Sequence, residues 1–148
     1  MLPPFVATSL MMLARRVMQA QPSQILGPDG DPYLERWWLE KDNREGSIYI
    51  HRMLRSDRDK FHDHPADNLS IVLEGEMKEY TPEGVFLRGP GSLIARKAED
   101  RHWIEIQAPL VTMWIMGPKI RDWGFWREGE AGEEFVPCQQ YFREKGYT

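Results

Sequence analysis

The sequence predicts an all-β protein, a jelly roll built from two packed sheets. Short segments in which polar and apolar residues alternate follow one another along most of the chain, and Gly and Pro residues stand between them. Beyond residue 32 no segment between these strands has the 3.6-residue period of an amphipathic helix. Many evenly spaced short strands without helices between them are typical of a β-sandwich or barrel, and the double-sheet jelly roll is the type that fits.

The 148 residues are enough for one domain with a core of its own. We expect residues 1–32 to form an N-terminal helix and turn segment, and residues 33–127 to form the barrel. Residues 128–148 are charged and rich in Gly, which predicts a C-terminal tail that is ordered only if it packs on a neighbour.

The first segment contains the expected helix, for which Thr8 or Ser9 is the candidate N-cap. An apolar stripe at the spacing i, i+3, i+7 follows, formed by Leu10, Leu13 and Val17. The favoured interpretation is a helix that packs across the barrel or at a dimer interface, and the alternative is a helix on a membrane surface.

The barrel segment is read as a series of strands from their period of two and their turn residues. The expected strands cover residues 33–40, 47–55, 68–74, 75–80, 85–88, 92–96, 102–107 and 110–116, with a final strand near 120–126. In the second of them, Arg52 shares the face of Ile48 and Ile50, which we expect to be buried, and His51 lies on the opposite face.

Composition restricts the compartment and the partners. The single Cys138 excludes an internal disulfide, and the sequence contains neither an apolar run of membrane-spanning length nor a signal-peptide cleavage pattern, so a cytoplasmic protein is expected. A net charge of -4 argues against binding to nucleic acid, which needs a basic surface. The expected partner is a small molecule.

His62 and His64 are the strongest functional signal. Two histidines one residue apart on an extended chain project to the same side, so both imidazoles can reach one ion. Only one further histidine follows, His102, at the start of another expected strand. Three neutral imidazoles suit Fe(II), Zn(II), Mn(II), Ni(II) or Cu(II) and leave coordination positions open. The alternative is that these histidines lie on a solvated loop or make ordinary structural contacts.

These residues resemble the two motifs of the cupin superfamily. His62, His64 and Gly75 stand where the first cupin motif has them, and His102 is similar to the histidine of the second. Asn68 stands where that motif has a metal-binding glutamate, which is similar to the three-histidine variant of thiol dioxygenase-type cupins.

Over residues 33–127 the chain resembles small single-domain cupins of bacterial and phage genomes, on the evidence of four short segments: Arg36–Trp38, Tyr49–Arg52, His62–Pro65 and Trp123–Phe125. The resemblance implies a double-stranded β-helix with a metal in the barrel, and it also implies a homodimer.

Three further residues are candidate catalytic groups. Asp67 has three interpretations: it binds the metal, orients a histidine, or caps the turn. Arg52 and Arg96 each bind a substrate carboxylate or phosphate, or else form an internal salt bridge or face solvent. Side chains that could supply a general acid or base are Glu74, Asp67, Tyr49 and Glu105.

Two function classes follow. The first is a metal-dependent enzyme acting on a small polar or anionic molecule, with a non-haem Fe(II) dioxygenase-type reaction preferred and hydrolysis of a phosphate ester or nucleotide as its variant. Convergence of Arg52 and Arg96 on the metal would favour that hydrolase. The second is a non-catalytic protein that binds or sequesters a small ligand in the barrel mouth.

Overall fold

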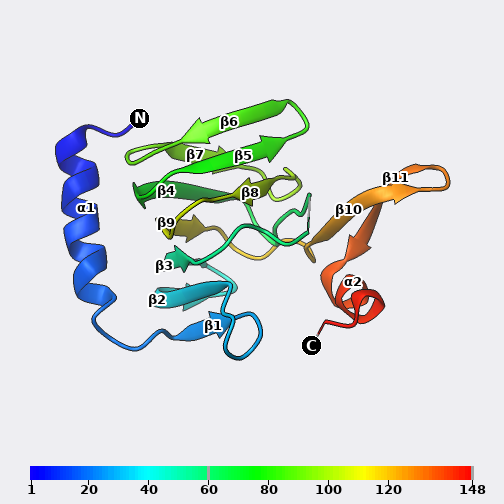
Figure 1. Ribbon diagram of the computed structural model, residues 1–148, viewed down its shortest axis with the longest axis horizontal. Coiled ribbons are helices and arrows are strands. Elements are labelled where there is room, and N and C mark those ends of the chain that lie inside the picture. Colours follow the sequence, from blue (N-terminus) through cyan, green and yellow to red (C-terminus); the bar gives the residue numbers. More distant parts are fainter. Residues whose placement is uncertain (60, 148) are drawn as a thin grey trace.

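The computed structural model describes residues 1–59 and 61–147, and these form a two-sheet β-sandwich with a helix against its outer face (Figure 1). The larger sheet has six antiparallel strands in the spatial order β1 (Gln24–Leu26), β2 (Leu34–Asp42), β3 (Gly46–Met53), β9 (Leu110–Met116), β4 (Asn68–Glu74) and β7 (Leu93–Arg96). The smaller sheet has the order β6 (Gly84–Arg88), β5 (Met77–Thr81) and β8 (Trp103–Glu105). The predicted all-β jelly roll is confirmed.

Helix α1 (Pro4–Val17) lies across the large sheet on the side away from the small sheet (Figure 1). It begins at Pro4, whose fixed φ suits the first helical position, so Thr8 and Ser9 lie inside the helix and neither is its N-cap. The expected packing across the barrel is confirmed, but the expected stripe is wrong at Leu13, which is 47% exposed. The helix buries Ala7, Met11 and Ala14 instead, a face that a search for large apolar residues overlooks.

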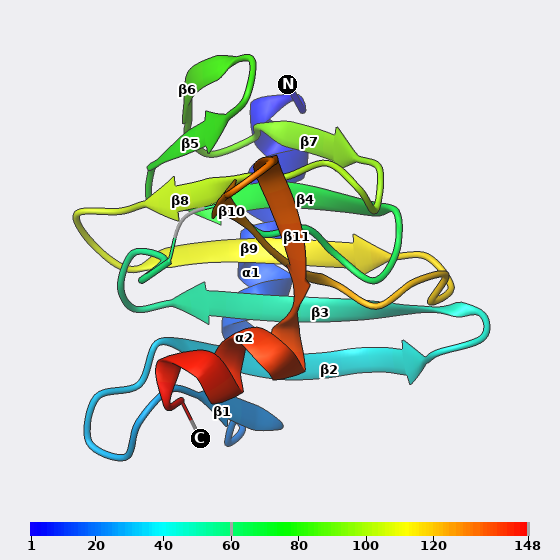
Figure 2. The ribbon, with the colours of Figure 1, turned by 90° about the vertical axis from the view of Figure 1, so that its right-hand side faces the viewer.

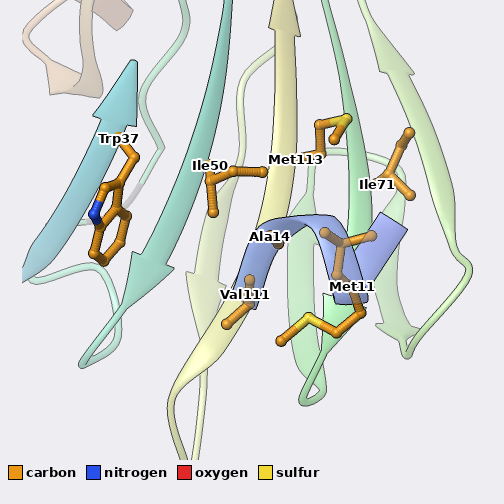
Figure 3. Close-up of a cluster of buried hydrophobic side chains, with 8 residues drawn as sticks. Met11, Ala14, Trp37, Ile50, Ile71, Val111 and Met113 are labelled. Carbon is orange, nitrogen blue, oxygen red and sulfur yellow. The ribbon is translucent and has the colours of Figure 1, made fainter. Parts of the chain in front are cut away.

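Both faces of the large sheet are covered, and the strands therefore carry apolar residues on both sides. Figure 3 shows the cluster under α1, in which Met11 and Ala14 meet side chains from four strands: Trp37, Ile50, Ile71, Leu73, Val111 and Met113. A second cluster fills one end of the space between the sheets with Met53, Val72, Met77, Ile94, Ile106 and Leu110. Burial of apolar area on both faces supplies the main stabilisation of the sandwich.

Gly75 allows the tight connection from β4 to β5. Its φ is 87°, in the left-handed region that favours glycine. A Cβ at this position would lie 2.7 Å from the carbonyl oxygen of Pro109, so a side chain could not fit without moving the backbone.

The C-terminal residues expected to form a tail instead form regular structure. β10 (Gly124–Gly129) and β11 (Gly132–Pro137) make a hairpin, and α2 (Cys138–Lys145) follows it (Figures 1 and 2). Phe125, Val136 and Tyr141 pack together as the hydrophobic cluster of this unit. The charges between these aromatic and apolar residues masked their spacing in the sequence. Neither described helix is long and apolar enough to cross a membrane.

Candidate metal centre

The three histidines predicted as metal ligands lie together. His62 and His64 belong to the extended segment before β4, and His102 directly precedes β8. The backbones of His62 and His102 pair through two N–H···O bonds of 3.0 Å, which ties the two segments to each other. One ligand atom from each imidazole lies within 4.8 Å of the others, close enough for all three to hold one ion.

Asp63 anchors the segment that carries the first two histidines. Its carboxylate is fully buried and accepts hydrogen bonds from the backbone N–H of Gly124 at 2.8 Å and the indole N–H of Trp126 at 2.9 Å. Arg121 adds an ion pair at 2.6 Å. Because alternation directs Asp63 away from its two neighbours, these contacts hold His62 and His64 on the opposite side of the chain. Asp63 thus connects the segment that carries His62 and His64 to β10.

Glu79 of β5 orients His102. Its Oε1 lies 2.8 Å from Nδ1 of His102 and 2.5 Å from Nη2 of Arg96, and Glu79 is 1% exposed. Arg88 contacts the other carboxylate oxygen at 3.1 Å. Burial opposes ionisation of Glu79, but the hydrogen bond from His102 and the charge of Arg96 outweigh it and lower the pKa of this carboxyl to about 2. An ionised Glu79 keeps the ring proton of His102 on Nδ1 and leaves Nε2 available to a metal.

Two of the three imidazoles, those of His64 and His102, are kept neutral, which is the form that binds a metal. Burial lowers the pKa of His102 to about 3, and burial together with the neighbouring His102 and His62 lowers the pKa of His64 well below its usual value. The buried Nδ1 of His64 has no hydrogen-bond partner among the described residues. Such a nitrogen is costly to leave alone and is explained by a ligand at the site. The residues therefore fit a divalent transition metal.

The histidines lie in the wall of a cavity of about 430 Å³ between the sheets. Its remaining lining is largely apolar and aromatic, with Trp114 beside His64 and Trp123 beside His62 at ring-centre distances of 5.1 and 6.3 Å. A volume of this size suits a small molecule placed next to the metal.

The structure brings one of the three candidate catalytic residues to the cavity. Arg96 lines it and donates to Ser70 at 2.9 Å as well as to Glu79. Arg52 lies on the face of β3 that α1 covers, where it pairs with Glu35 at 2.7 Å. The expectation that the face of Arg52 is buried is correct, but that face points to the helix, so Arg52 and Arg96 do not converge.

Asp67 lies at the surface, where it accepts the backbone N–H of Ala98 at 2.8 Å and approaches Lys97 at 3.4 Å. Of its three interpretations, this geometry corresponds to capping a turn. Asn68 is buried, and its amide donates to the carbonyl oxygen of Ala66 at 3.2 Å. The histidines are thus the only ligand group found among the described residues.

Glu79 and Arg36 belong to the site or its cavity and were not predicted as site residues from the sequence. Glu79 had a readable signal, because it stands two residues after the buried Met77 on β5 and therefore faces inward with it. His51 also lines the cavity. Alternation along the strand places it on the face opposite Arg52, and that face looks inward. Among the candidate acids and bases, Tyr49 lines the cavity, while Glu74 is exposed and Glu105 pairs with Lys78.

No protein-family model and no curated protein matches this sequence. Solved structures do match it. A cupin-superfamily sugar phosphate isomerase from Silicibacter pomeroyi has 14% identity and a TM-score of 0.53 over 72% of this chain and 78% of its own. A conserved protein with a double-stranded β-helix domain from Klebsiella pneumoniae has 14% identity and a TM-score of 0.53, with 68% and 89% covered.

The Fe(II) form of HppE is also similar, with 16% identity and a TM-score of 0.56. The match covers 66% of this chain but 57% of HppE, so this chain corresponds to a little over half of that protein. At these identities the matches show the fold alone. With its two sheets and the histidine cluster between them, the chain has the double-stranded β-helix fold of the cupin superfamily.

Proposed function

We propose that the protein is a metal-dependent enzyme that holds Fe(II) through His62, His64 and His102 and uses O2 to oxidise a small polar or anionic molecule. The observation that carries this proposal is the cluster of three imidazoles, within 4.8 Å of one another, in the wall of a cavity of about 430 Å³. Bound Fe(II) would supply the redox chemistry that allows O2 to react with an organic molecule.

The protein's own part is to hold the three rings and to exclude water. Glu79 fixes the orientation and tautomer of His102, and Asp63 fixes the segment of His62 and His64. Apolar and aromatic side chains, Trp114 and Trp123 among them, surround the position that a substrate would occupy. Such a lining keeps reactive species from bulk solvent.

Oxidation is favoured over hydrolysis because the described residues that line the cavity include no carboxylate free of other contacts that could act as a base. Among the described residues its lining carboxylates are Asp57 and Asp63. Asp57 accepts the hydroxyl of Tyr33 and the N–H of Ile104, and Asp63 is committed to the β10 contacts. The separation of Arg52 from Arg96 also removes the feature that would have favoured a phosphate-ester hydrolase.

Elemental analysis of the purified protein, beside a His62→Ala, His64→Ala double variant, tests the proposal. We expect about one equivalent of metal in the wild type and none in the variant, and O2 consumption by the Fe(II)-loaded wild type with a suitable substrate. Absence of metal from both proteins would refute the proposal. Stoichiometric iron without O2 consumption across a broad set of small polar and anionic molecules would favour the alternative, a non-catalytic ligand-binding protein.

A further inference from the structure

Arg36 is a cation of the cavity wall that has no carboxylate partner among the described residues. It projects from β2 into the cavity between the sheets, whereas its neighbours Glu35 and Trp37 face α1. Its Nε donates to Nε2 of His51 at 2.9 Å, and its Nη1 donates to Oε1 of Gln24 at 3.0 Å. Both partners are neutral acceptors, so they position the guanidinium without neutralising it.

The second cation of the cavity, Arg96, already has an anionic partner. Arg96 contacts the carboxylate of Glu79 through both Nε and Nη2, at 2.8 and 2.5 Å. The carboxylates that line the cavity, Asp57 and Asp63, are bound to other groups. Among the described residues, Arg36 is therefore the cation of this cavity that no anion contacts.

The surroundings of Arg36 are arranged to hold its planar group still. The ring of Tyr49 lies 5.0 Å from its guanidinium carbon, and His51 stacks between Tyr49 and Trp114 at ring-centre distances of 5.6 and 5.8 Å. Burial lowers the pKa of His51 well below its usual value, so this histidine is neutral and accepts the Arg36 N–H. A guanidinium fixed in this way presents its remaining N–H groups in the fork that suits carboxylate and phosphate oxygens.

The position of Arg36 relative to the metal centre limits the size of the ligand. In the sheet order, β2 and β9 are separated by β3, which places their backbones roughly 10 Å apart. Trp114 of β9 contacts His64, so Arg36 and the histidines stand at two ends of one continuous row of side chains. A ligand that touches both ends must be several bonds long.

We propose that Arg36 binds the anionic group of the substrate, a carboxylate or a phosphate, while the reacting part of the same molecule lies at the metal. This assignment rests on the proposed function and specifies its substrate class as an elongated small organic anion. His51 and Gln24 act as positioning residues for Arg36. Arg96 is already paired with Glu79, the residue that orients His102, so it is not the residue that binds the substrate anion.

The test measures anion binding directly, by calorimetry at fixed ionic strength with the Zn(II)-loaded protein. The probes are glutarate, its uncharged diamide and inorganic phosphate. We expect glutarate or phosphate to bind the wild type at millimolar concentration and the diamide not to bind. Arg36→Gln should weaken anion binding by about tenfold to a hundredfold, because a charge-assisted pair is lost. Arg52→Gln is the matched control on the covered face, and it should bind as the wild type does.

Arg36→Lys keeps the charge but not the fork, so its affinity should be intermediate. This variant also decides the matter if Arg36→Gln does not fold, because wild-type affinity in Arg36→Lys would overturn the proposal. Failure of both anions to bind the wild type, or equal weakening by Arg36→Gln and Arg52→Gln, would overturn it as well.

The double variant His62→Ala, His64→Ala separates this proposal from the metal proposal. It should lose the metal and keep anion binding, because Arg36 is intact. Loss of anion binding together with the metal would assign the anion to the metal and overturn the role of Arg36. The metal proposal fails independently, if the wild type contains no metal.

Discussion

Replacing Glu79 with Gln tests the link between the buried charges and the metal centre. The substitution preserves the size of the side chain and one acceptor oxygen but removes the negative charge that contacts both His102 and Arg96. The side chains of Glu79 and Arg96 are 2% and 5% exposed, so solvent does not screen their interaction. Removing one member of such a pair leaves a buried charge uncompensated, which typically costs about 3–5 kcal/mol.

Two measurements separate the effect of Glu79→Gln on stability from its effect on metal affinity. Urea denaturation of the metal-free protein should show the loss of unfolding free energy, equivalent to a fall in Tm of roughly 6–20 °C for a domain of this size. Competition with a chromogenic chelator should show metal affinity about tenfold to a hundredfold lower, because a neutral amide holds the ring proton of His102 on Nδ1 less strongly than the carboxylate does. Glu105→Gln is the control, since Glu105 is a third exposed and 3.7 Å from Lys78, and its effect should be below about 1 kcal/mol.

A double variant, Glu79→Leu with Arg96→Met, distinguishes charge compensation from orientation of the histidine. Removing both charges should recover much of the stability lost in Glu79→Gln, because apolar residues of similar volume replace buried pairs well. Metal affinity should stay low, because Nδ1 of His102 still has no carboxylate partner. Wild-type metal affinity in Glu79→Gln would refute the orienting role, and unchanged stability would refute the account of the buried charges.

Four further predictions concern the segment that carries His62 and His64, the neighbouring Asn68 and the buried histidines. His102→Ala should abolish stoichiometric metal with the fold intact by circular dichroism, whereas Asn68→Ala should barely change metal affinity, and a large loss there would make Asn68 a ligand. Asp63→Asn should lower the free energy of unfolding by about 1–3 kcal/mol, because it weakens the buried contacts with Gly124 and Arg121, and an unchanged urea midpoint would contradict this. Burial lowers the pKa of three histidines, so below a pH of about 6.5 the unfolded chain binds protons that the folded chain does not. These residues are His51, His64 and His102. The stability of the metal-free protein should therefore fall as the pH is lowered from neutral, by up to about 1.4 kcal/mol per pH unit for each of them. Urea midpoints that do not change across this pH range would contradict this prediction.

The cluster of three histidines could be predicted from the sequence because local geometry determines most of their arrangement. The spacing of His62 and His64 fixes their common direction on an extended chain, and only one later histidine was available to join them. The strands could be predicted equally well, because the alternation of residues that indicates a strand and the turn residues that end it lie within each short segment. The bounds of β3, β4 and β9 agree with the expected strands to within two residues.

The direction of Arg52 could not be predicted, because parity separates the two faces of a strand without saying which one faces the cavity. In β3 both faces are buried, one under α1 and the other between the sheets, so both are rich in apolar residues. An ordinary sandwich strand shows its outer face by polarity, and here α1 removes that signal. Only the packing of the helix assigns Arg52 to the outside and His51 to the cavity.

The polar residues of the inner face give a physical reason to locate function at one end of the sandwich. Along the space between the sheets, apolar side chains such as Met53 and Leu110 give way to Ser70, Thr112 and Arg96. Burying polar groups is unfavourable unless each has a partner, and an apolar filling would serve a purely structural jelly roll at least as well. The chain nevertheless keeps a buried carboxylate, Glu79, whose contacts serve a metal-ligand candidate. A buried Glu79 is explained if its function is to hold His102 in the orientation that a metal site needs.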